Sequence, residues 1–261
     1  MKYGFIGCGN MGGAIAKSLS KATKDIAVSD RSGRAKTLAT ELGITYSDNA
    51  SIAQNCDRVF LAVKPYFMKD VLTAIRPQLA ENKPLLITMA GGVEIQQIED
   101  YVGFRLPVIR IMPNTPTAIG KGVTQYCCND LVRDEDVQDW LNDMRFCGLL
   151  DALEERLIDA ASAISGSGPA YMYVFLEALA DGAVTCGIPR AQAYEYAAMT
   201  MVGAAEMYLQ TKQHPGVLKD AVCSPLGSTI RGVKALEEGG FRAAAMNCII
   251  ATYERNKEMG K

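Results

Sequence analysis

The chain has 261 residues, of which 49% are hydrophobic and 21% charged, the composition of an ordinary globular protein with a core. A formal net charge of -2 excludes nonspecific binding to nucleic acid, which needs a basic surface, but leaves a small anionic substrate open. No apolar run reaches the roughly 20 residues of a membrane span, and the first predicted strand directly follows Met1. We therefore expect a cytoplasmic protein without a leader.

The 8 cysteines form neither a C-x-x-C pair nor a cluster with metal-ligand spacing. Most lie in apolar runs, where a free cysteine behaves as a small hydrophobic residue. We interpret them as buried thiols of a reducing compartment, and we expect no metal site.

The first half alternates between short apolar strands and helices. Strands are predicted at residues 2–6 and 26–29, with helices at 11–19 and 33–42. Continuous apolar runs follow, separated by helical segments, and they are typical of parallel strands covered on both faces: 58–63, 85–89 and 108–112. This alternation predicts a Rossmann-like, doubly wound parallel sheet over residues 1–152.

A glycine-rich loop, Gly7-Cys8-Gly9-Asn10-Met11-Gly12, follows the first strand. G-x-G-x-x-G alone is a weak signal, but here a strand precedes it, a helix follows it, and Asp30 ends the second strand. Gly7 permits the tight turn, Gly9 lets the backbone approach a pyrophosphate, and Gly12 lets the helix pack closely on the strand. The loop predicts a dinucleotide cofactor, against the alternative of a turn without a ligand.

The residues after the second strand leave the choice of nicotinamide cofactor open. Asp30 stands where a carboxylate would hold the ribose hydroxyls of NAD. The residues after it suit the 2′-phosphate of NADP, unless they are routine charges of a solvated helix start: Arg31, Ser32, Arg34 and Lys36. We favour NADPH, with NADH as the alternative.

Three further loops follow strands, at the sheet edge where such folds bind ligands. Strand termination by itself explains their prolines, Pro65 among them, but not the polar residues Lys64 and Asn114. The turn at Ala90 and Gly91 permits close backbone approach.

The second half reads as an all-helical domain over residues 153–261. Helices are predicted at 152–164, 169–186, 190–209 and 241–259. Segments such as 193–207 are apolar most of the way round, so they must be buried, and this half is too small to bury them by itself. We expect an obligate oligomer, with a compact monomer as the alternative.

Two segments of this half are neither helix nor ordinary linker. Residues 164–171 are small and enter a helix, either as a functional segment or as a helix break with close backbone packing. Residues 220–230 offer the hydroxyls of Ser224, Ser228 and Thr229 near a helix start at Gly227 or Ser228. A carboxylate could bind there. The equal alternative is a Ser-Pro turn in which Ser228 or Thr229 caps the helix.

Six motifs in order carry a resemblance: GFIGCGNMG at 4–12, AVKP at 62–65, MPNTP at 112–116, SGSGPAY at 165–171, DAVCSPLGSTI at 220–230 and EEGGFR at 237–242. Together they resemble the pyrroline-5-carboxylate reductase family over essentially the whole chain. The resemblance implies a Rossmann domain and a helical domain whose helices intertwine in a homodimer, with decamers in many members. It also implies reduction of the C=N bond of Δ1-pyrroline-5-carboxylate by NADPH or NADH, the last step of proline biosynthesis.

The resemblance and the loops above give one set of candidate site residues. The predicted cofactor contacts are Ile6, Gly7, Cys8, Gly9, Asn10, Met11, Asp30, Arg31, Ala62, Lys64, Pro65, Ala90, Gly91 and Asn114. The predicted substrate contacts are Ser224, Gly227, Ser228 and Thr229, with the Thr229 hydroxyl near the imine nitrogen as the catalytic group. One position departs from the family: Leu226 stands where members often have the first of two glycines, and its side chain could narrow the pocket.

The expected chemistry needs little acid–base catalysis. An imine is basic enough to be protonated in water, so the site must mainly orient the ring and hold its carboxylate. The single histidine, His214, lies away from every motif and is interpreted as a loop residue. Lys64 is expected to support the cofactor, because a cation beside an iminium would oppose it.

Two other functions stay open. One is another imine or β-hydroxyacid oxidoreductase of the same architecture, although a catalytic lysine for the latter is missing from residues 154–208. The other is a nucleotide-sensing module without turnover.

Overall fold

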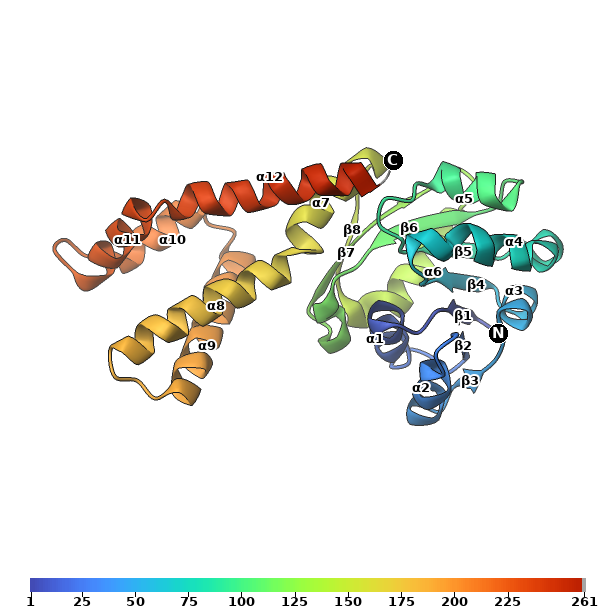
Figure 1. Cartoon of the computed structure of the whole chain (residues 1–261), viewed down its shortest axis with the longest axis horizontal. Coiled ribbons are helices and arrows are strands. Elements are labelled where there is room, and N and C mark those ends of the chain that lie inside the picture. The colour runs from blue at the N-terminus through green and yellow to red at the C-terminus, as the bar shows by residue number, and fades with distance from the viewer. Residues whose placement is uncertain (260–261) are drawn as a thin grey trace. The chain divides into compact units, whose positions relative to one another are not determined.

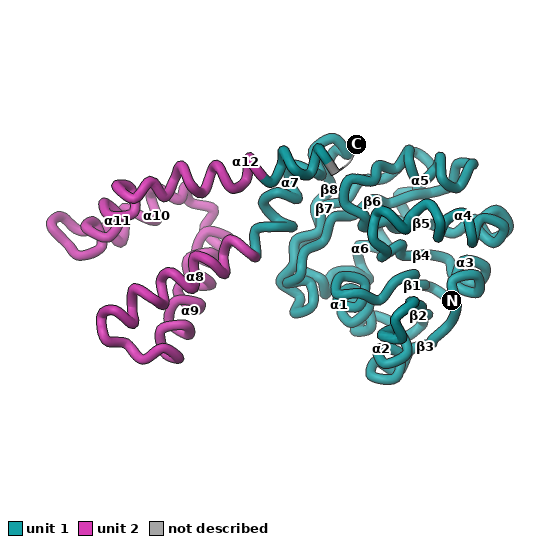
Figure 2. The backbone as a smooth tube through the Cα atoms, viewed as in Figure 1, with its two compact units in different colours: residues 1–169, 252–261 teal, residues 170–251 magenta. Residues whose placement is uncertain are grey.

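The computed structural model describes residues 1–259, which form two compact units (Figures 1 and 2). Unit 1 comprises Met1–Pro169 and the chain from Thr252 onward, and unit 2 comprises Ala170–Ala251. The predicted domain boundary at residue 153 directly follows the last strand, and it remains a proposal. Gly260 and Lys261, the end of the predicted helical domain, lie outside the described residues.

Unit 1 is built on one sheet of eight strands in the order β3-β2-β1-β4-β5-β6-β7-β8. The strands are β1 (Tyr3–Ile6), β2 (Ile26–Ser29), β3 (Thr45–Tyr46), β4 (Arg58–Leu61), β5 (Leu85–Thr88), β6 (Val108–Met112), β7 (Gly122–Cys128) and β8 (Gly148–Ala152). The order turns back at β1, so the chain winds outward in both directions. The predicted doubly wound, Rossmann-like sheet is therefore confirmed.

One strand departs from the predicted parallel sheet, because β7 runs antiparallel to β6. The connection between them holds only the short helix η1 (Thr115–Ile119). A parallel return needs a crossover of a dozen or more residues, so this short connection forces the reversal. Pairing becomes parallel again between β7 and β8, which are joined through a helix.

Helices cover both faces of the sheet, which explains the continuous apolar strands (Figure 1). One buried cluster joins the sheet to α1 (Asn10–Leu19), α2 (Arg34–Leu42) and α6 (Asp134–Met144). A second cluster joins the opposite face to α3 (Asn49–Asn55), α4 (Pro65–Asn82) and α5 (Ile95–Val102). Neighbouring residues of β1 divide accordingly: Phe5 lies in the first cluster and Ile6 in the second.

The rest of the chain is helical, as predicted. The helices are α7 (Glu155–Ser165), α8 (Gly168–Thr185), α9 (Arg190–Thr211), α10 (Pro215–Val222), α11 (Ser228–Glu238) and α12 (Phe241–Met259). Unit 2 buries little of itself: α9 has two buried residues, Ala193 and Ala197, and α10 and α11 have none. No helix in residues 1–259 has the length and apolarity to cross a membrane.

Candidate functional site

The glycine-rich loop lies where the strand order reverses, between the carboxyl ends of β1 and β4. Gly7 has φ +105°, and a side chain there would place its Cβ 2.5 Å from the Ala62 carbonyl oxygen. A Cβ on Gly12 would clash with Gly7 and Ala62. These glycines thus make the turn and the close helix–strand packing, and such a switch point is where this fold binds ligands.

Gly9, unlike Gly7 and Gly12, borders open space. A side chain on Gly9 would meet no atom within 4 Å, so the backbone is open to an approaching ligand. Gly9 is also the N-cap of α1, whose first N–H groups have no partner within the helix. Open space in front of a helix N-terminus fits the pyrophosphate of a dinucleotide. Of the predicted cofactor residues next to Gly9 in the chain, Ile6 and Cys8 are buried, Met11 is half-buried, and Asn10 is exposed.

Cys8 is not a reactive group in this loop. Burial raises the pKa of its thiol to about 12, with the nearby Asp30 carboxylate adding to the effect. The thiol therefore stays neutral near pH 7 and acts as a small apolar side chain.

Asp30 uses its carboxylate to organise its own loop. Its two oxygens accept from Ser32 Oγ at 2.7 Å and from the Gly33 N–H at 2.9 Å. Burial opposes ionisation, but hydrogen bonds from Ser32 and backbone N–H groups outweigh it and hold the pKa of Asp30 below its usual value. The carboxylate is therefore charged and engaged within the turn that presents Arg31.

An aromatic pair in the first turn of α4 lies beside Arg31 of the loop after β2. The Arg31 guanidinium carbon lies 5.2 Å from the centroid of the Phe67 ring. The Phe67 and Tyr66 rings are 4.4 Å apart, and Tyr66 is 73% exposed. Planar and cationic groups of this kind suit the adenosine end of a dinucleotide. Neither aromatic residue was predicted as a site residue, although two adjacent aromatic residues at a helix start beside the sheet edge could have indicated one.

The other predicted cofactor residues lie on the same sheet edge. Lys64 is the exposed N-cap of α4, and Pro65 takes the first helical position, where its missing N–H costs nothing. Ala90 is buried after β5, and Gly91 lines a small cavity of about 40 Å³ with Gly92, Met112, Asp159, Ser162 and Asn256.

Asn114 connects two of the sequence motifs. Its Nδ2 donates to the Ser165 carbonyl at 2.9 Å, and its Oδ1 accepts from the Val123 N–H at 2.9 Å. Ser165 Oγ in turn donates to Gln125 Oε1 at 3.0 Å. Asn114 is only 6% exposed, so its amide holds the end of α7 against β7 and keeps one N–H and one lone pair for another partner. The start of the 164–171 segment thus serves as a helix break with close packing.

A second buried polar residue, Arg110 on β6, was not singled out from the sequence. Its side chain is 1% exposed and donates to Glu155 at 3.2 Å and to Asp159 at 2.9 Å. Glu155 also accepts the Ile95 N–H at 2.8 Å, so β6, α5 and α7 are tied together. A buried arginine needs partners for its charge. An arginine within an apolar strand could therefore have predicted a buried ion pair from the sequence.

The serine-proline loop of unit 2 presents its polar groups to solvent. Gly227 is the N-cap of α11 and has no side chain to cap it, so the alternative that Ser228 or Thr229 is the cap is wrong. The Gly227 N–H donates to the Ser224 carbonyl at 3.0 Å, and a Cβ on Gly227 would clash with Ser224 Oγ. Ser224, Ser228 and Thr229 are exposed beside the first N–H groups of α11, an arrangement that can bind a carboxylate.

His214 and Leu226 of unit 2 have local structural features of their own. His214 caps α10, because its Nδ1 accepts the Gly216 N–H at 3.1 Å, in agreement with the interpretation as a loop histidine. Leu226 has φ +62°, the left-handed conformation that glycine adopts freely and that leucine disfavours.

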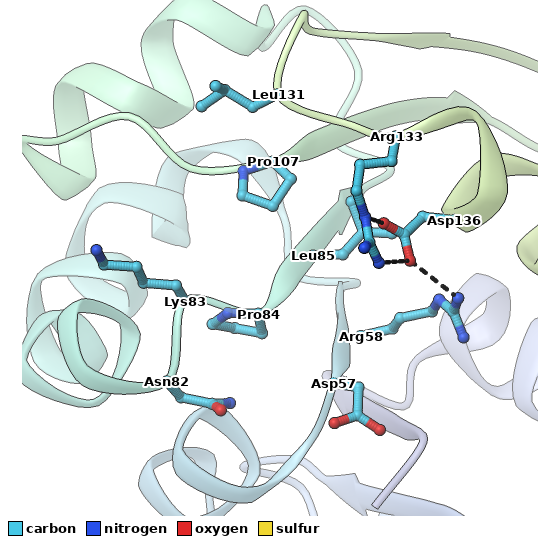
Figure 3. Close-up of a pocket in the computed structure, with 10 residues that line it drawn as sticks. All are labelled: Asp57, Arg58, Asn82, Lys83, Pro84, Leu85, Pro107, Leu131, Arg133 and Asp136. Carbon is cyan, nitrogen blue, oxygen red and sulfur yellow. Dashed lines mark hydrogen bonds and ion pairs between the residues drawn. The ribbon is translucent and has the colours of Figure 1, made fainter.

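A larger cavity of about 500 Å³ lies at the opposite edge of the sheet, before β4, β5 and β6 (Figure 3). Two of its arginines, Arg58 and Arg133, both pair with Asp136. None of the predicted site residues lines it.

Two protein families match the chain. Residues 155–259 match the pyrroline-5-carboxylate reductase dimerisation family, and residues 2–91 match the NADP oxidoreductase, coenzyme F420-dependent family. Pyrroline-5-carboxylate reductase of Escherichia coli is 41% identical, covering 100% of this chain and 98% of its own. The enzyme of that name from Methanosarcina acetivorans is 40% identical with the same coverage.

Solved structures agree with these matches over the whole length. The Plasmodium falciparum pyrroline carboxylate reductase with NADP bound has a TM-score of 0.89 at 34% identity, covering 100% of this chain and 98% of that one. The Coxiella burnetii pyrroline-5-carboxylate reductase has a TM-score of 0.91 at 34% identity, with the same coverage. From the open glycine loop, the exposed hydroxyls before α11 and these full-length similarities, we conclude that the chain belongs to the pyrroline-5-carboxylate reductase family.

Proposed function

We propose that this protein reduces the C=N bond of Δ1-pyrroline-5-carboxylate with NADPH and gives L-proline, the last step of proline biosynthesis. The observation that carries the proposal is the start of α11, where Ser224, Ser228 and Thr229 stand exposed in a chain similar to pyrroline-5-carboxylate reductases over its full length. If these hydroxyls served only to begin helix α11, one of them would cap its first N–H groups, and none of them does.

The glycine-rich loop would hold the cofactor. The pyrophosphate would lie against Gly9 and the first N–H groups of α1, where no atom of the protein fills the space. Lys64, Ala90 and Asn114 would support the nicotinamide end at the neighbouring loops. The bound dihydronicotinamide supplies the hydride.

The loop before α11 would hold the imino acid. Its carboxylate would accept hydrogen bonds from the N–H groups at the helix start and from the hydroxyls of Ser224 and Ser228. The hydride adds to the imine carbon, the π electrons of the C=N bond move to nitrogen, and nitrogen keeps a proton taken from water. Thr229 would hydrogen-bond this nitrogen, so its hydroxyl orients the ring.

The loop after β2 favours NADPH over NADH. The Asp30 oxygens that would bind ribose hydroxyls already accept internal donors. The turn they form presents Arg31 and Arg34, both exposed, and two cations suit a 2′-phosphate.

Association through the C-terminal helices would bury the apolar surface of the helical unit. Large apolar side chains stand exposed on unit 2, for example Tyr196 at 59%, Met199 at 68% and Val202 at 50%. Exposed apolar surface of this extent is typical of a subunit interface. We propose a homodimer through these helices, and the decamer implied by the resemblance as a further assembly step. The cytoplasmic location remains a prediction.

The test follows oxidation of the reduced cofactor by its absorbance, with Δ1-pyrroline-5-carboxylate and either NADPH or NADH. Thr229→Ala should lower kcat/KM by about 10-fold to 100-fold, the equivalent of one lost hydrogen bond to a charged group, with unchanged NADPH affinity. Thr185→Ala is the control, because that exposed hydroxyl bonds only its own helix, at the Asp181 carbonyl.

The outcomes separate the remaining functions. Oxidation that requires the imino acid supports the reductase. Oxidation of the cofactor by other imines, or reduction of NADP+ by β-hydroxyacids, without turnover of this substrate would favour a different oxidoreductase. Cofactor binding without any turnover would favour a sensing module.

A further inference from the structure

We propose that Leu226 sets the substrate size of this enzyme: its side chain forms the apolar wall against which the ring of the imino acid packs, and it restricts that ring to five members. The inference rests on the proposed function, because it assigns the occupant of the same loop.

The backbone of Leu226 requires an explanation. Its φ of +62° is a conformation that glycine adopts freely and that leucine disfavours. The other non-glycine residues with positive φ among residues 1–259 are Lys83 and Lys212, and each is the C-cap of a helix. Left-handed residues commonly end helices, so capping accounts for both lysines. Leu226 ends no helix, and a glycine would fit its conformation better.

The side chain of Leu226 gains no contact within the chain in return. An apolar residue just before an N-cap usually packs against the fourth residue of the helix. That residue here is Arg231, and Leu226 remains 89% exposed, the highest value among the large hydrophobic side chains that the structure describes. A strained, unburied leucine is costly unless something outside the chain covers it.

Its position identifies the covering group. Leu226 directly precedes Gly227, the N-cap of α11, and lies two residues after Ser224 and three before Thr229. A carboxylate on the first N–H groups of α11 therefore brings its attached ring within reach of this side chain. The ring methylenes of the imino acid need an apolar surface, and Leu226 is the larger of the two apolar side chains in residues 224–229.

The consequence is a preference that depends on ring size. A fixed leucine wall leaves room for a five-membered ring and opposes the six-membered homologue with one more methylene. Differences of one methylene in an apolar pocket change kcat/KM by roughly 10-fold to 200-fold. Leu226→Gly should remove the wall and leave the backbone in the conformation it already has.

The experiment compares kcat/KM for Δ1-pyrroline-5-carboxylate and for its six-membered ring homologue, with NADPH, in the full-length protein. Leu226→Gly should raise the ratio of six-membered to five-membered kcat/KM by about tenfold. Leu226→Asn should also raise it, because asparagine tolerates the left-handed conformation but offers no apolar wall. Both variants should keep the NADPH dissociation constant and the oligomeric state of the wild type.

Lys212→Gly is the matched control, since it relieves the same backbone conformation in the same unit away from the loop. It should leave the ratio unchanged, whereas a ratio that rises equally would assign the effect to backbone strain and overturn the proposal. An unchanged ratio in folded Leu226→Gly, or a changed oligomeric state with an unchanged ratio, would also overturn it. Failure of the wild type to reduce either imino acid would instead refute the proposed function.

Discussion

At the scale of single residues, the structure gives the Asp30 carboxylate a different role from the one that its position in the sequence predicts. From its position alone, its carboxylate belongs to the ribose of NAD. In the fold it accepts hydrogen bonds from Ser32 Oγ and the Gly33 N–H, and the same turn presents Arg31 toward Phe67 in the first turn of α4. A motif specifies where a residue stands, but the hydrogen bonds of the loop decide whether its polar atoms remain available.

Arg31→Ala should therefore affect the two cofactors differently. Loss of a charge-assisted contact to the 2′-phosphate should raise KM for NADPH by about 10-fold to 100-fold and leave KM for NADH nearly unchanged. Steady-state kinetics with each cofactor would measure this. Arg156→Ala is a suitable control, because Arg156 is an exposed arginine of unit 1 paired only with Glu154. Equal increases for both cofactors would indicate that Arg31 contacts the shared adenosine instead.

At the scale of elements, Arg110 links strand β6 to helix α7. Replacing it with methionine keeps the volume but leaves Glu155 and Asp159 beside an apolar side chain. Breaking a buried ion pair typically costs about 3–5 kcal/mol. Because Glu155 and Asp159 are 33% and 26% exposed, solvent reduces this, and we expect a loss of about 2 kcal/mol in the free energy of unfolding.

Urea denaturation followed by circular dichroism would measure the effect. Arg105→Ala is the control and should change stability little, since the Arg105 ion pairs with Asp130 and Glu99 are solvent-exposed on the arginine side. Adding Glu155→Gln and Asp159→Asn to Arg110→Met should recover part of the loss. No loss in Arg110→Met would mean that α7 is held by apolar packing alone.

The elements also show what the sequence could predict. Strands β1, β2, β4, β5 and β6 were visible because both of their faces are buried, which makes most of their residues apolar. Strand β8 was missed because it is half-exposed, and β7 because polar residues such as Thr124 and Gln125 interrupt its apolar run. The hydrogen bond from Asn114 to Ser165 could not be predicted either, since it joins residues 51 positions apart.

At the scale of the whole molecule, the helical unit requires a partner to bury its surface. Helix α9 has 22 residues, yet only Ala193 and Ala197 are buried among them. The matched dimerisation family covers this region, and the apolar residues that face solvent on α9 are those that a second subunit would cover. Stability and association are thus coupled, and the unfolding of this protein should depend on its concentration.

Val202→Asp tests this coupling at the middle of α9, where valine is 50% exposed. A charge buried at an apolar interface should weaken the dimer by at least about 100-fold in dissociation constant, because the carboxylate has no partner there. Sedimentation velocity at micromolar concentration would then detect monomer for the variant and dimer or larger species for the wild type.

Tyr46→Asp provides the comparison, since Tyr46 is an equally exposed apolar residue, at 49%, on strand β3 of unit 1. It should sediment as the wild type does. If Val202→Asp also sediments as the wild type does, α9 is not part of the interface. If the wild type itself is monomeric, the exposed surface of unit 2 is not a subunit interface, and the requirement for association fails with it.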